Sequence, residues 1–527
     1  MRRRGAGPAG RAHVVLVGAV MAVACLAAGC SSSGGSARRS NSAVPVTSTS
    51  GAGPRVDVVL SVKGSRPVAT VDDRFQSYNI EMVEVTGGEF WKPYDAGPGK
   101  VVRPPLDLSS ERLRNLARGL GPAYIRVSGS WANSTYFDVD GTSGGTPAAG
   151  FSGVLTPQQW KGVGEFADAV EGKVVTSFAS SPGARDASGA WLVGQARALL
   201  EFSKANRVPV VAAELFNEPS LPIGMPAGYD AAAFGRDLTT FKKMVEQVAP
   251  RLKIVGPGAV EDVTPIIVES PTIKAADMMQ AAIGTFDVVS YHFYPKVSER
   301  CGSKEGPEVA LTREFLSRVE ADKSFYEGLR DSYAPHAPMW VTETAQAACG
   351  GDRWAATYRD VIRYVDNLGR QATGDGDVVF HNTLAASDYG LLDENGLVPR
   401  PNYWAAVLWH RLMGPEVLTP GARDLPADLA VYSHCTPGRS GGVTHVVVNS
   451  STTATRTVAT GSGEADVYLL TSDSLDSASI ALNGTVLAAA ADGTLPPTKA
   501  KRLGGAVEIP PASVAFVVDR SRVAACS

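Results

Sequence analysis

A long alternation of short apolar runs with helical stretches, from Phe75 to about Leu412, constrains this chain most. Apolar runs of strand length are typical of buried strands, and the segments between them carry apolar residues at helical spacing. About eight such repeats predict parallel strands joined by crossover helices, and therefore a (β/α)₈ barrel. We place this α/β TIM barrel at residues 71–416. A doubly wound sheet is the alternative, although no Gly-x-Gly-x-x-Gly motif follows an early strand.

The individual barrel elements are predicted from the same periodicity. The expected strands are 78–83, 123–127, 174–178, 208–215, 253–255, 286–292, 339–342 and 378–382. The expected helices are 109–120, 190–206, 231–248, 275–283, 309–329, 354–368 and 403–412.

The pattern changes after about Val417, where short β-branched runs are separated by Gly, Ser and Asn turns. These runs are 431–433, 443–448, 457–460, 465–470, 479–482 and 514–518. Short strands with turn residues between them predict a β-sandwich over residues 417–527. Residues 55–70 precede the barrel and contain a strand-like segment, which we expect to join that sandwich.

The first thirty residues have the pattern of an export signal. Several arginines precede an apolar stretch over residues 13–28, which ends in Ala27-Ala28-Gly29-Cys30. The basic flank, short apolar core and small residues indicate a signal peptide, and the ending resembles a bacterial lipobox with its leucine one place early. This resemblance implies lipidation of Cys30, and an ordinary secretory signal is the alternative. Residues 31–54, rich in Ser, Gly and Thr, predict a disordered tether. We therefore expect an exported lipoprotein on the extracellular face of the membrane.

Four cysteines lie beyond the signal segment, namely Cys301, Cys349, Cys435 and Cys526. An even number in an exported protein favours disulfides. Three pairings are open, of which we favour Cys301 with Cys349 and Cys435 with Cys526. Zinc binding is the alternative, but no two of these cysteines have the close spacing that zinc sites favour.

The overall charge is close to balanced, with 50 basic and 53 acidic residues and a formal net charge of −3. This balance argues against a strongly basic surface for nucleic acid or for heavily sulfated polyanions. No metal-ligand spacing such as His-Glu-x-x-His is present, so we expect no metal and no cofactor. We expect a monomer.

Two glutamates follow predicted strands in the places where a barrel enzyme holds its catalytic groups. Glu218 lies in Asn217-Glu218-Pro219 after the fourth strand, and Glu343 ends the seventh strand. Catalytic groups of such barrels gather at the carboxyl ends of the strands. Glycoside hydrolysis needs one carboxyl to protonate the leaving oxygen and a second to attack the anomeric carbon or activate water. Either glutamate alone could be a helix cap or a solvated acid, but the pair predicts a glycosidase.

Longer segments resemble glycoside hydrolase family 79, which contains heparanase and β-glucuronidases. The resemblance covers about residues 75–414 and is specific at 113–126 and 392–395, and it also includes 343–344 with 350–351, 389–391 and 401–404. It implies that Glu218 is the acid/base and Glu343 the nucleophile of a retaining mechanism. It also implies that Asn217 binds the sugar 2-hydroxyl.

The resemblance further implies a set of substrate-binding residues, which are Glu81, Ser130, Tyr294, Gly350, Gly351 and Tyr389. Tyr294 matches the tyrosine that bonds the nucleophile. Gly350, Gly351 and Tyr389 match the groups that bind the sugar carboxylate. Glu81 and Ser130 stand where mammalian heparanase has aspartate and threonine. Cys349 replaces a further glycine, which puts the turn geometry in doubt unless a disulfide to Cys301 fixes it.

The function expected from these residues is cleavage of β-D-glucuronides, with exo action first and endo action on a glucuronic-acid-containing polysaccharide second. A β-xylosidase or α-L-arabinofuranosidase of the same clan is one alternative, and a non-catalytic carbohydrate-binding lipoprotein is another. His292 at the sixth strand is either a packed rim residue or part of the site. Three tryptophans, Trp91, Trp131 and Trp354, are equally open to sugar stacking or to packing.

Overall fold

The structure, a computed structural model, describes residues 56–61, 64–97, 99–260, 262–264, 273–419, 422 and 424–527. The expected signal peptide, the lipidation site Cys30 and the tether lie outside these residues. Eight parallel strands close into a barrel, which confirms the predicted fold class and excludes the doubly wound sheet. Among the described helices, none has the length and apolar character needed to cross a membrane.

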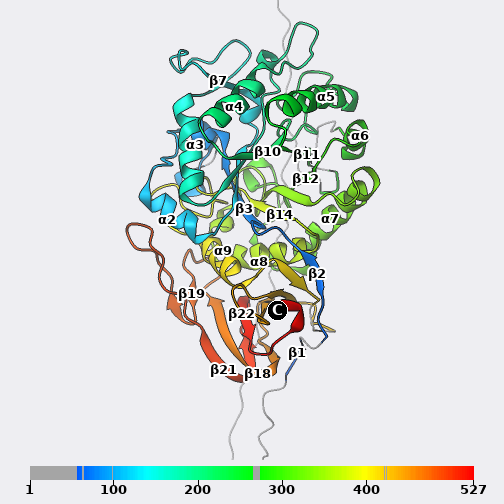
Figure 1. Cartoon of the computed structure of the whole chain (residues 1–527). Coiled ribbons are helices and arrows are strands. Elements are labelled where there is room, and N and C mark those ends of the chain that lie inside the picture. The colour runs from blue at the N-terminus through cyan, green and yellow to red at the C-terminus, as the bar shows by residue number, and fades with distance from the viewer. Residues whose placement is uncertain are drawn as a thin grey trace, which may run out of the picture. The chain divides into compact units, whose positions relative to one another are not determined.

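Each barrel strand is followed by a helix on the outside of the barrel (Figure 1). The strands are β3 (Gln76–Glu81), β6 (Tyr124–Ser128), β9 (Lys173–Thr176), β10 (Val210–Glu214), β11 (Lys253–Ala259), β12 (Val288–Phe293), β13 (Met339–Thr344) and β14 (Val378–His381). The helices are α2 (Glu111–Gly119), α3 (Pro157–Ala169), α4 (Gly194–Ala205), α5 (Ala231–Val248), α6 (Ala275–Ala281), α7 (Arg313–Tyr333), α8 (Arg359–Gln371) and α9 (Pro401–Leu412). β14 pairs with β3 and closes the ring.

The sequence pattern did not predict α3, because Gly162 and Gly164 lie inside it and glycine is a weak helix former. The helix begins at a capping box, in which Thr156 and Gln159 satisfy each other's backbone amides. Packing of Trp160 and Phe166, both fully buried, outweighs the low propensity.

The barrel interior changes from apolar to polar toward the carboxyl ends of the strands. Tyr124, Trp340 and Phe380 pack together with the valines of neighbouring strands in an apolar layer. Two residues further along their strands lie Arg126 and Thr342, because alternate residues of a strand share a face. This polar layer lies directly beneath the mouth of the barrel.

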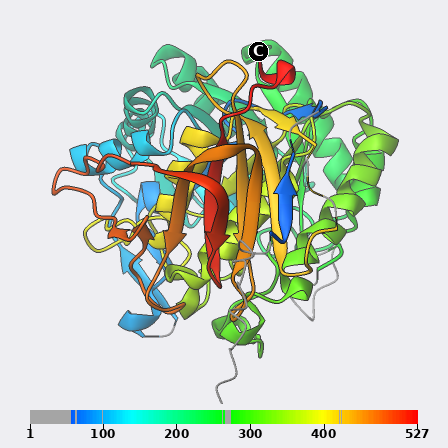
Figure 2. The same ribbon diagram turned by 90° about the horizontal axis from the view of Figure 1, so that it is seen from below.

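The smaller domain is a ten-stranded sheet against the outer side of α8 and α9 (Figure 2). Its strands are β1 (Val58–Leu60), β2 (Pro67–Thr70), β15 (Glu416–Leu418), β16 (Leu429–Cys435), β17 (Val443–Asn449), β18 (Arg456–Thr471), β19 (Ala481–Leu482), β20 (Thr485–Val486), β21 (Lys501–Ile509) and β22 (Ser513–Asp519). The N-terminal segment contributes two strands: β1 pairs with β18 and β2 pairs with β15. A disulfide joins Cys435 to Cys526.

The central strand β17 is buried on both faces, which explains its continuous run of valines. Val446 and Val448 pack toward the barrel, whereas Val447 packs into the second core of the sheet domain. Two strands predicted at 457–460 and 465–470 are one strand, β18, interrupted by an irregular register. β21 was not predicted, because Gly504 and Gly505 interrupt its apolar pattern.

Candidate active site

The two glutamates meet in a cleft of about 960 Å³ at the carboxyl ends of the barrel strands. Its described lining is Glu81, Trp91, Lys100, Ser130, Trp131, Asn133, Ser134, Ser152, Asn217, Glu218, Leu221, Ile223, Val260, Tyr294, Val297, Cys301, Gly302, Ser303, Glu343, Ala348, Cys349, Asn382 and Tyr389. Seven of the nine catalytic and substrate-binding residues predicted from sequence are therefore on this surface. Gly350 and Gly351 are buried and lie against Trp91 and Tyr389, which line the cleft.

Glu343 is held from two sides by hydrogen-bond donors. Nη1 of Arg126 donates to its Oε1 at 2.8 Å, and the hydroxyl of Tyr294 donates to its Oε2 at 2.8 Å. Burial alone would raise the pKa of Glu343. The charges of His292 and Arg126 and the hydrogen bonds from Arg126 and Tyr294 outweigh burial and hold that pKa below its usual value. Glu343 is therefore kept ionised, as a nucleophile requires.

Glu218 lies opposite Glu343 and is bound to His292. Nδ1 of His292 and Oε1 of Glu218 are hydrogen-bonded at 2.9 Å, and Nδ2 of Asn217 donates to Oε2 at 3.3 Å. One carboxylate oxygen from each glutamate and a ring nitrogen of His292 lie within 4.8 Å of one another. The backbone φ of Glu218 is 43°, in the left-handed region that non-glycine residues rarely occupy. A strained backbone conformation of this kind persists only where the surrounding structure holds it, and it occurs most often at functional sites.

His292 therefore belongs to the site and is not only a packed rim residue. Burial lowers its pKa, but the charge of Glu343 and the hydrogen bond to Glu218 outweigh burial and raise the pKa above its usual value. Nη2 of Arg126, 3.3 Å from Nε2 of His292, opposes the positive charge.

Arg126 lies in the polar layer of the barrel and hydrogen-bonds several residues of the site. It donates through Nε and Nη2 to Oε2 of Glu214 at 2.9 and 2.7 Å, and through Nη2 to Oδ1 of Asn217 at 2.9 Å. Ser290 and Thr342 donate to the other oxygen of Glu214, each at 2.8 Å. Arg126 and Glu214 lie within predicted strands, so their periodicity alone does not distinguish them from core positions. Charged residues inside an otherwise apolar barrel strand were the available signal.

Glu81 ends β3 and faces the same cleft. Nδ2 of Asn382 donates to Oε1 of Glu81 at 3.1 Å and to the hydroxyl of Tyr294 at 2.9 Å. Burial and then the charge of Glu343 raise the pKa of Glu81 well above its usual value, which favours its protonated carboxyl. A Cβ at Gly129 would lie 1.4 Å from Oε2 of Glu81, so only glycine leaves room for this side chain. Asn382, which follows the last barrel strand, was not predicted as a site residue.

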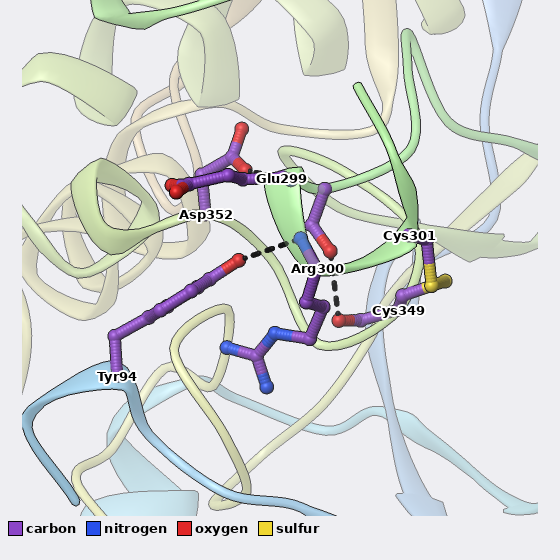
Figure 3. Close-up of a disulfide and its surroundings, with 7 residues drawn as sticks. Tyr94, Glu299, Arg300, Cys301, Cys349 and Asp352 are labelled. Carbon is purple, nitrogen blue, oxygen red and sulfur yellow. Dashed lines mark hydrogen bonds between the residues drawn. A yellow bond between two sulfur atoms is a disulfide. The ribbon is translucent and has the colours of Figure 1, made fainter. Parts of the chain in front are cut away.

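The turn after β13 carries the second disulfide. Cys349 is bonded to Cys301, and Oγ of Ser298 donates to the backbone oxygen of Cys349 at 3.1 Å (Figure 3). The φ of Cys349 is 60°, so this cysteine adopts the conformation for which the turn was expected to need glycine. Both disulfides therefore have the pairing favoured from sequence.

The turn and the loop that carries Tyr389 are bonded to each other. The backbone amide of Tyr389 donates to the oxygen of Gly350 at 3.3 Å. A Cβ at Gly350 would lie 2.5 Å from Oγ of Ser387 and 2.7 Å from the Cβ of Trp91, so glycine permits this close packing. The predicted carboxylate-binding set is thus brought together, with Tyr389 and Cys349 at the cleft surface.

The three tryptophans left open by the sequence divide into two groups. Trp91 and Trp131 line the cleft, and Nζ of Lys100 lies 4.7 Å and 5.6 Å from their ring centroids. Trp354 packs against Phe315 in the barrel core. Trp354 is therefore a packing residue, whereas the other two are available to a substrate.

The described residues contain one group of three side chains close enough to share a metal ion, namely Glu218, His292 and Glu343. The positively charged Arg126 and the hydroxyl of Tyr294 already donate hydrogen bonds to the two carboxylate oxygens of Glu343. A second cation would meet the repulsion of this guanidinium. The donor set fits a pair of catalytic carboxyls better than a metal centre.

Comparison with known proteins identifies the family. A family model described as glycosyl hydrolase family 79, N-terminal domain, matches residues 57–369. The chain belongs to this family of glycosidases. The matched residues begin just before β1 and end within α8, so they include Glu218 and Glu343.

Several curated proteins are similar over most of the chain. Heparanase-like protein 1 of Arabidopsis thaliana is 27% identical over 438 residues, which cover 77% of this chain and 75% of that protein. Heparanase of Bos taurus is 26% identical over 528 residues, or 88% and 91% of the two chains. Baicalin-beta-D-glucuronidase of Scutellaria baicalensis is 30% identical over 259 residues, or 46% and 45%. Inactive heparanase-2 of Homo sapiens is 23% identical over 91% of each chain.

Solved structures with the same fold are more distant in sequence. A 4-O-alpha-L-rhamnosyl-beta-D-glucuronidase from Fusarium oxysporum has a TM-score of 0.59 and 14% identity, covering 88% of this chain and 100% of that one. An alpha-L-arabinofuranosidase from Thermotoga maritima has a TM-score of 0.60 with the same identity and coverage. These likenesses show the fold alone.

Proposed function

We propose that this protein is a retaining β-D-glucuronidase that acts by double displacement. The spacing of the two carboxyls supports the retaining part of the proposal: one oxygen of Glu218 and one of Glu343 lie within 4.8 Å of each other. Retaining glycosidases hold their carboxyl groups roughly 5–5.5 Å apart, whereas inverting enzymes leave roughly 6.5–9.5 Å for a water molecule.

In the first step, ionised Glu343 attacks the anomeric carbon, and the bond to the leaving oxygen breaks. Glu218 gives its proton to that oxygen, so the leaving group departs as a neutral alcohol. In the second step, Glu218 takes a proton from water, and the water oxygen displaces Glu343 from the anomeric carbon. Glu218 ends protonated and Glu343 ionised, so both regain their starting states.

The contacts of Glu343 suit this cycle. Arg126 and Tyr294 stabilise its negative charge before attack and again as it leaves the sugar. His292 bonds Glu218 and links it electrostatically to Glu343, so the two carboxyls share one polar neighbour. Asn217, fixed through its backbone amide by Asn133 at 3.0 Å, is placed to bind the sugar 2-hydroxyl.

The glucuronide preference is supported by the carboxylate-binding set of Gly350, Gly351 and Tyr389 and by glucuronidases among the relatives. Exo action is our first choice and endo action the second. A β-xylosidase or α-L-arabinofuranosidase would keep both glutamates without needing this set. A binding protein without catalysis is disfavoured because Glu218, Glu343, Asn217 and Tyr294 are all present and belong to one hydrogen-bond network through Arg126.

The test uses the protein without its first thirty residues, assayed on chromogenic β-D-glucuronide, β-D-xyloside and α-L-arabinofuranoside. Glucuronide turnover that is abolished in both Glu218→Gln and Glu343→Gln supports the proposal. Turnover of another sugar alone would refute the uronate preference while keeping the two roles. A β-anomer of the first-formed product, seen by proton NMR, supports retention, and an α-anomer would refute it.

We also propose export with lipid attachment at Cys30, on the basis of the signal pattern alone. In a bacterial host, the full chain should fractionate with membranes and label with fatty acid. Cys30→Ala should remove the label, and persistence of the label in that variant would refute lipidation at this residue.

A further inference from the structure

The cleft wall beside Glu218 is apolar. Leu221 and Ile223 follow Glu218 in the loop between β10 and α5, and Val260 and Val297 follow β11 and β12. All four side chains line the cleft. Ile223 is 59% exposed, whereas Leu221 is 7% exposed. Ile223 therefore presents apolar surface to the cleft, whereas Leu221 is packed behind it in the apolar cluster that also contains Val260 and Tyr294.

The loop that carries this wall is held in place by its own hydrogen bonds. The amide of Leu221 donates to the backbone oxygen of Glu218 at 3.0 Å. The amide of Val260 donates to Oγ of Ser220 at 3.1 Å, which ties the loop to the end of β11. These bonds fix the backbone of Leu221 relative to that of Glu218 and to the end of β11.

We use the position of Glu218 to infer which side of the scissile bond the apolar wall contacts. The leaving oxygen must come within hydrogen-bond reach of Glu218 to receive its proton. A sugar whose anomeric carbon is attacked by Glu343 has its leaving oxygen on the side of Glu218, and the loop that carries Leu221 and Ile223 continues directly from Glu218. A neighbouring hollow of about 580 Å³ shares Leu221 and continues this surface with Pro222 and Met225.

We propose that Leu221, Ile223, Val260 and Val297 form a leaving-group subsite for an apolar, planar aglycone such as a fused aromatic ring. This inference rests on the proposed glycosidase function and specifies its substrate. An aromatic ring over Ile223 removes apolar surface of both partners from water. The hydroxyl groups of a sugar in the same place would gain no hydrogen bond from these four aliphatic side chains, which is unfavourable, and would have only polar side chains elsewhere on the cleft, such as Asn133 and Ser134, as partners.

The test compares two isoleucines that are both exposed. Ile223→Ser removes the apolar contact in the cleft, and Ile283→Ser is the matched control, since Ile283 is 65% exposed but does not line the cleft. Each variant is assayed on a coumarin β-D-glucuronide and on a disaccharide with a β-linked glucuronic acid at its non-reducing end. Taking the variant-to-wild-type ratio for each substrate cancels the different reactivities of the two leaving groups.

For Ile223→Ser, kcat/KM on the coumarin glucuronide should fall about tenfold, as for lost apolar contacts in a binding pocket. The kcat/KM of Ile223→Ser on the disaccharide should change less than twofold. Ile283→Ser should leave kcat/KM unchanged on both substrates. Ile223→Phe, which enlarges the apolar surface, should keep or raise activity on the coumarin substrate. Inhibition by the free coumarin alcohol should weaken in Ile223→Ser by a similar factor.

An equal loss on both substrates, or a larger loss on the disaccharide, would overturn the aglycone assignment while leaving the glycosidase function in place. Wild-type protein that unfolds cooperatively but cleaves neither glucuronide would instead refute the proposed function. The two failures are therefore distinguished by wild-type activity alone.

Discussion

The hydroxyl of Tyr294 donates a 2.8 Å hydrogen bond to Oε2 of Glu343 and accepts one of 2.9 Å from Asn382. Three strand ends thus converge on one oxygen atom, because Tyr294 follows β12, Glu343 lies in β13 and Asn382 follows β14. Burial and then the charge of Glu343 raise the pKa of Tyr294 well above its usual value, so the hydroxyl remains a donor throughout the physiological range.

Tyr294→Phe should lower kcat by roughly 10- to 100-fold, because a hydrogen bond to a charged group contributes about 1.5–3 kcal/mol. The measurement is steady-state turnover of an aryl β-D-glucuronide. Tyr364→Phe is the matched control, since the Tyr364 hydroxyl is buried without a hydrogen-bond partner among the described residues. Equal loss in both variants would mean that the Tyr294 hydroxyl has no specific role.

His292→Gln should move the acid limb of the kcat/KM profile to higher pH. The His292 charge is the strongest influence that lowers the pKa of Glu343, so its removal raises that pKa. In the proposed mechanism activity requires ionised Glu343 and is lost as pH falls through its folded-state pKa, so the loss should begin at higher pH in the variant. The check is a pH–rate profile of both proteins, and an unmoved acid limb would contradict the assignment of Glu343 as nucleophile.

The same depressed pKa has a consequence for stability. Because the folded-state pKa of Glu343 is below its unfolded value, the ionised carboxylate contributes stability above the unfolded value, and this is lost as pH falls through the folded-state pKa. Glu343→Gln should therefore unfold with a smaller acid dependence than wild type below about pH 4.5. Urea unfolding at several pH values measures the free energy of unfolding of both proteins. If this free energy changes with pH equally in Glu343→Gln and in the wild type, the ionised carboxylate of Glu343 does not contribute the expected stability.

Arg126→Met should destabilise the fold by about 3–5 kcal/mol, because it leaves the carboxylates of Glu214 and Glu343 buried without their cation. Thermal unfolding measures the loss. Arg502→Met, which breaks an exposed pair with Glu464, is the control and should leave the melting temperature unchanged within error. Similar melting temperatures for the two variants would contradict the central role of Arg126 in the barrel.

Replacing the disulfide of the cleft by Cys301→Ser and Cys349→Ser should raise KM for the glucuronide several-fold while changing kcat little. The bond fixes the turn beside Gly350 and Tyr389 and does not touch either glutamate. Reductant should raise KM of wild type in the same way and have no further effect on KM in the double variant. A reductant effect that persists in the variant would assign it to the Cys435–Cys526 bond instead.

Part of the site was predictable because its signals are local. Asn217-Glu218-Pro219 and Glu343 each follow a buried apolar run, and the carboxyl ends of parallel strands meet at one end of a barrel. Ser130, Tyr294 and Tyr389 were matched by family resemblance and line the same cleft. The cysteine pairing was chosen among three, and both favoured bonds are present.

The sequence by itself determined the strand–helix alternation, the smaller β domain and the two glutamates. These features depend on hydrophobic periodicity, turn residues and short motifs, each of which involves residues close together in the sequence. Only the tertiary structure decided that Arg126 binds a carboxylate 217 residues away and that Asn382 reaches Glu81 across 301 residues. It also decided that Trp91 and Trp131 face the cleft while Trp354 lies in the core. Barrel closure and register set these contacts, and neither is encoded in the spacing of adjacent residues.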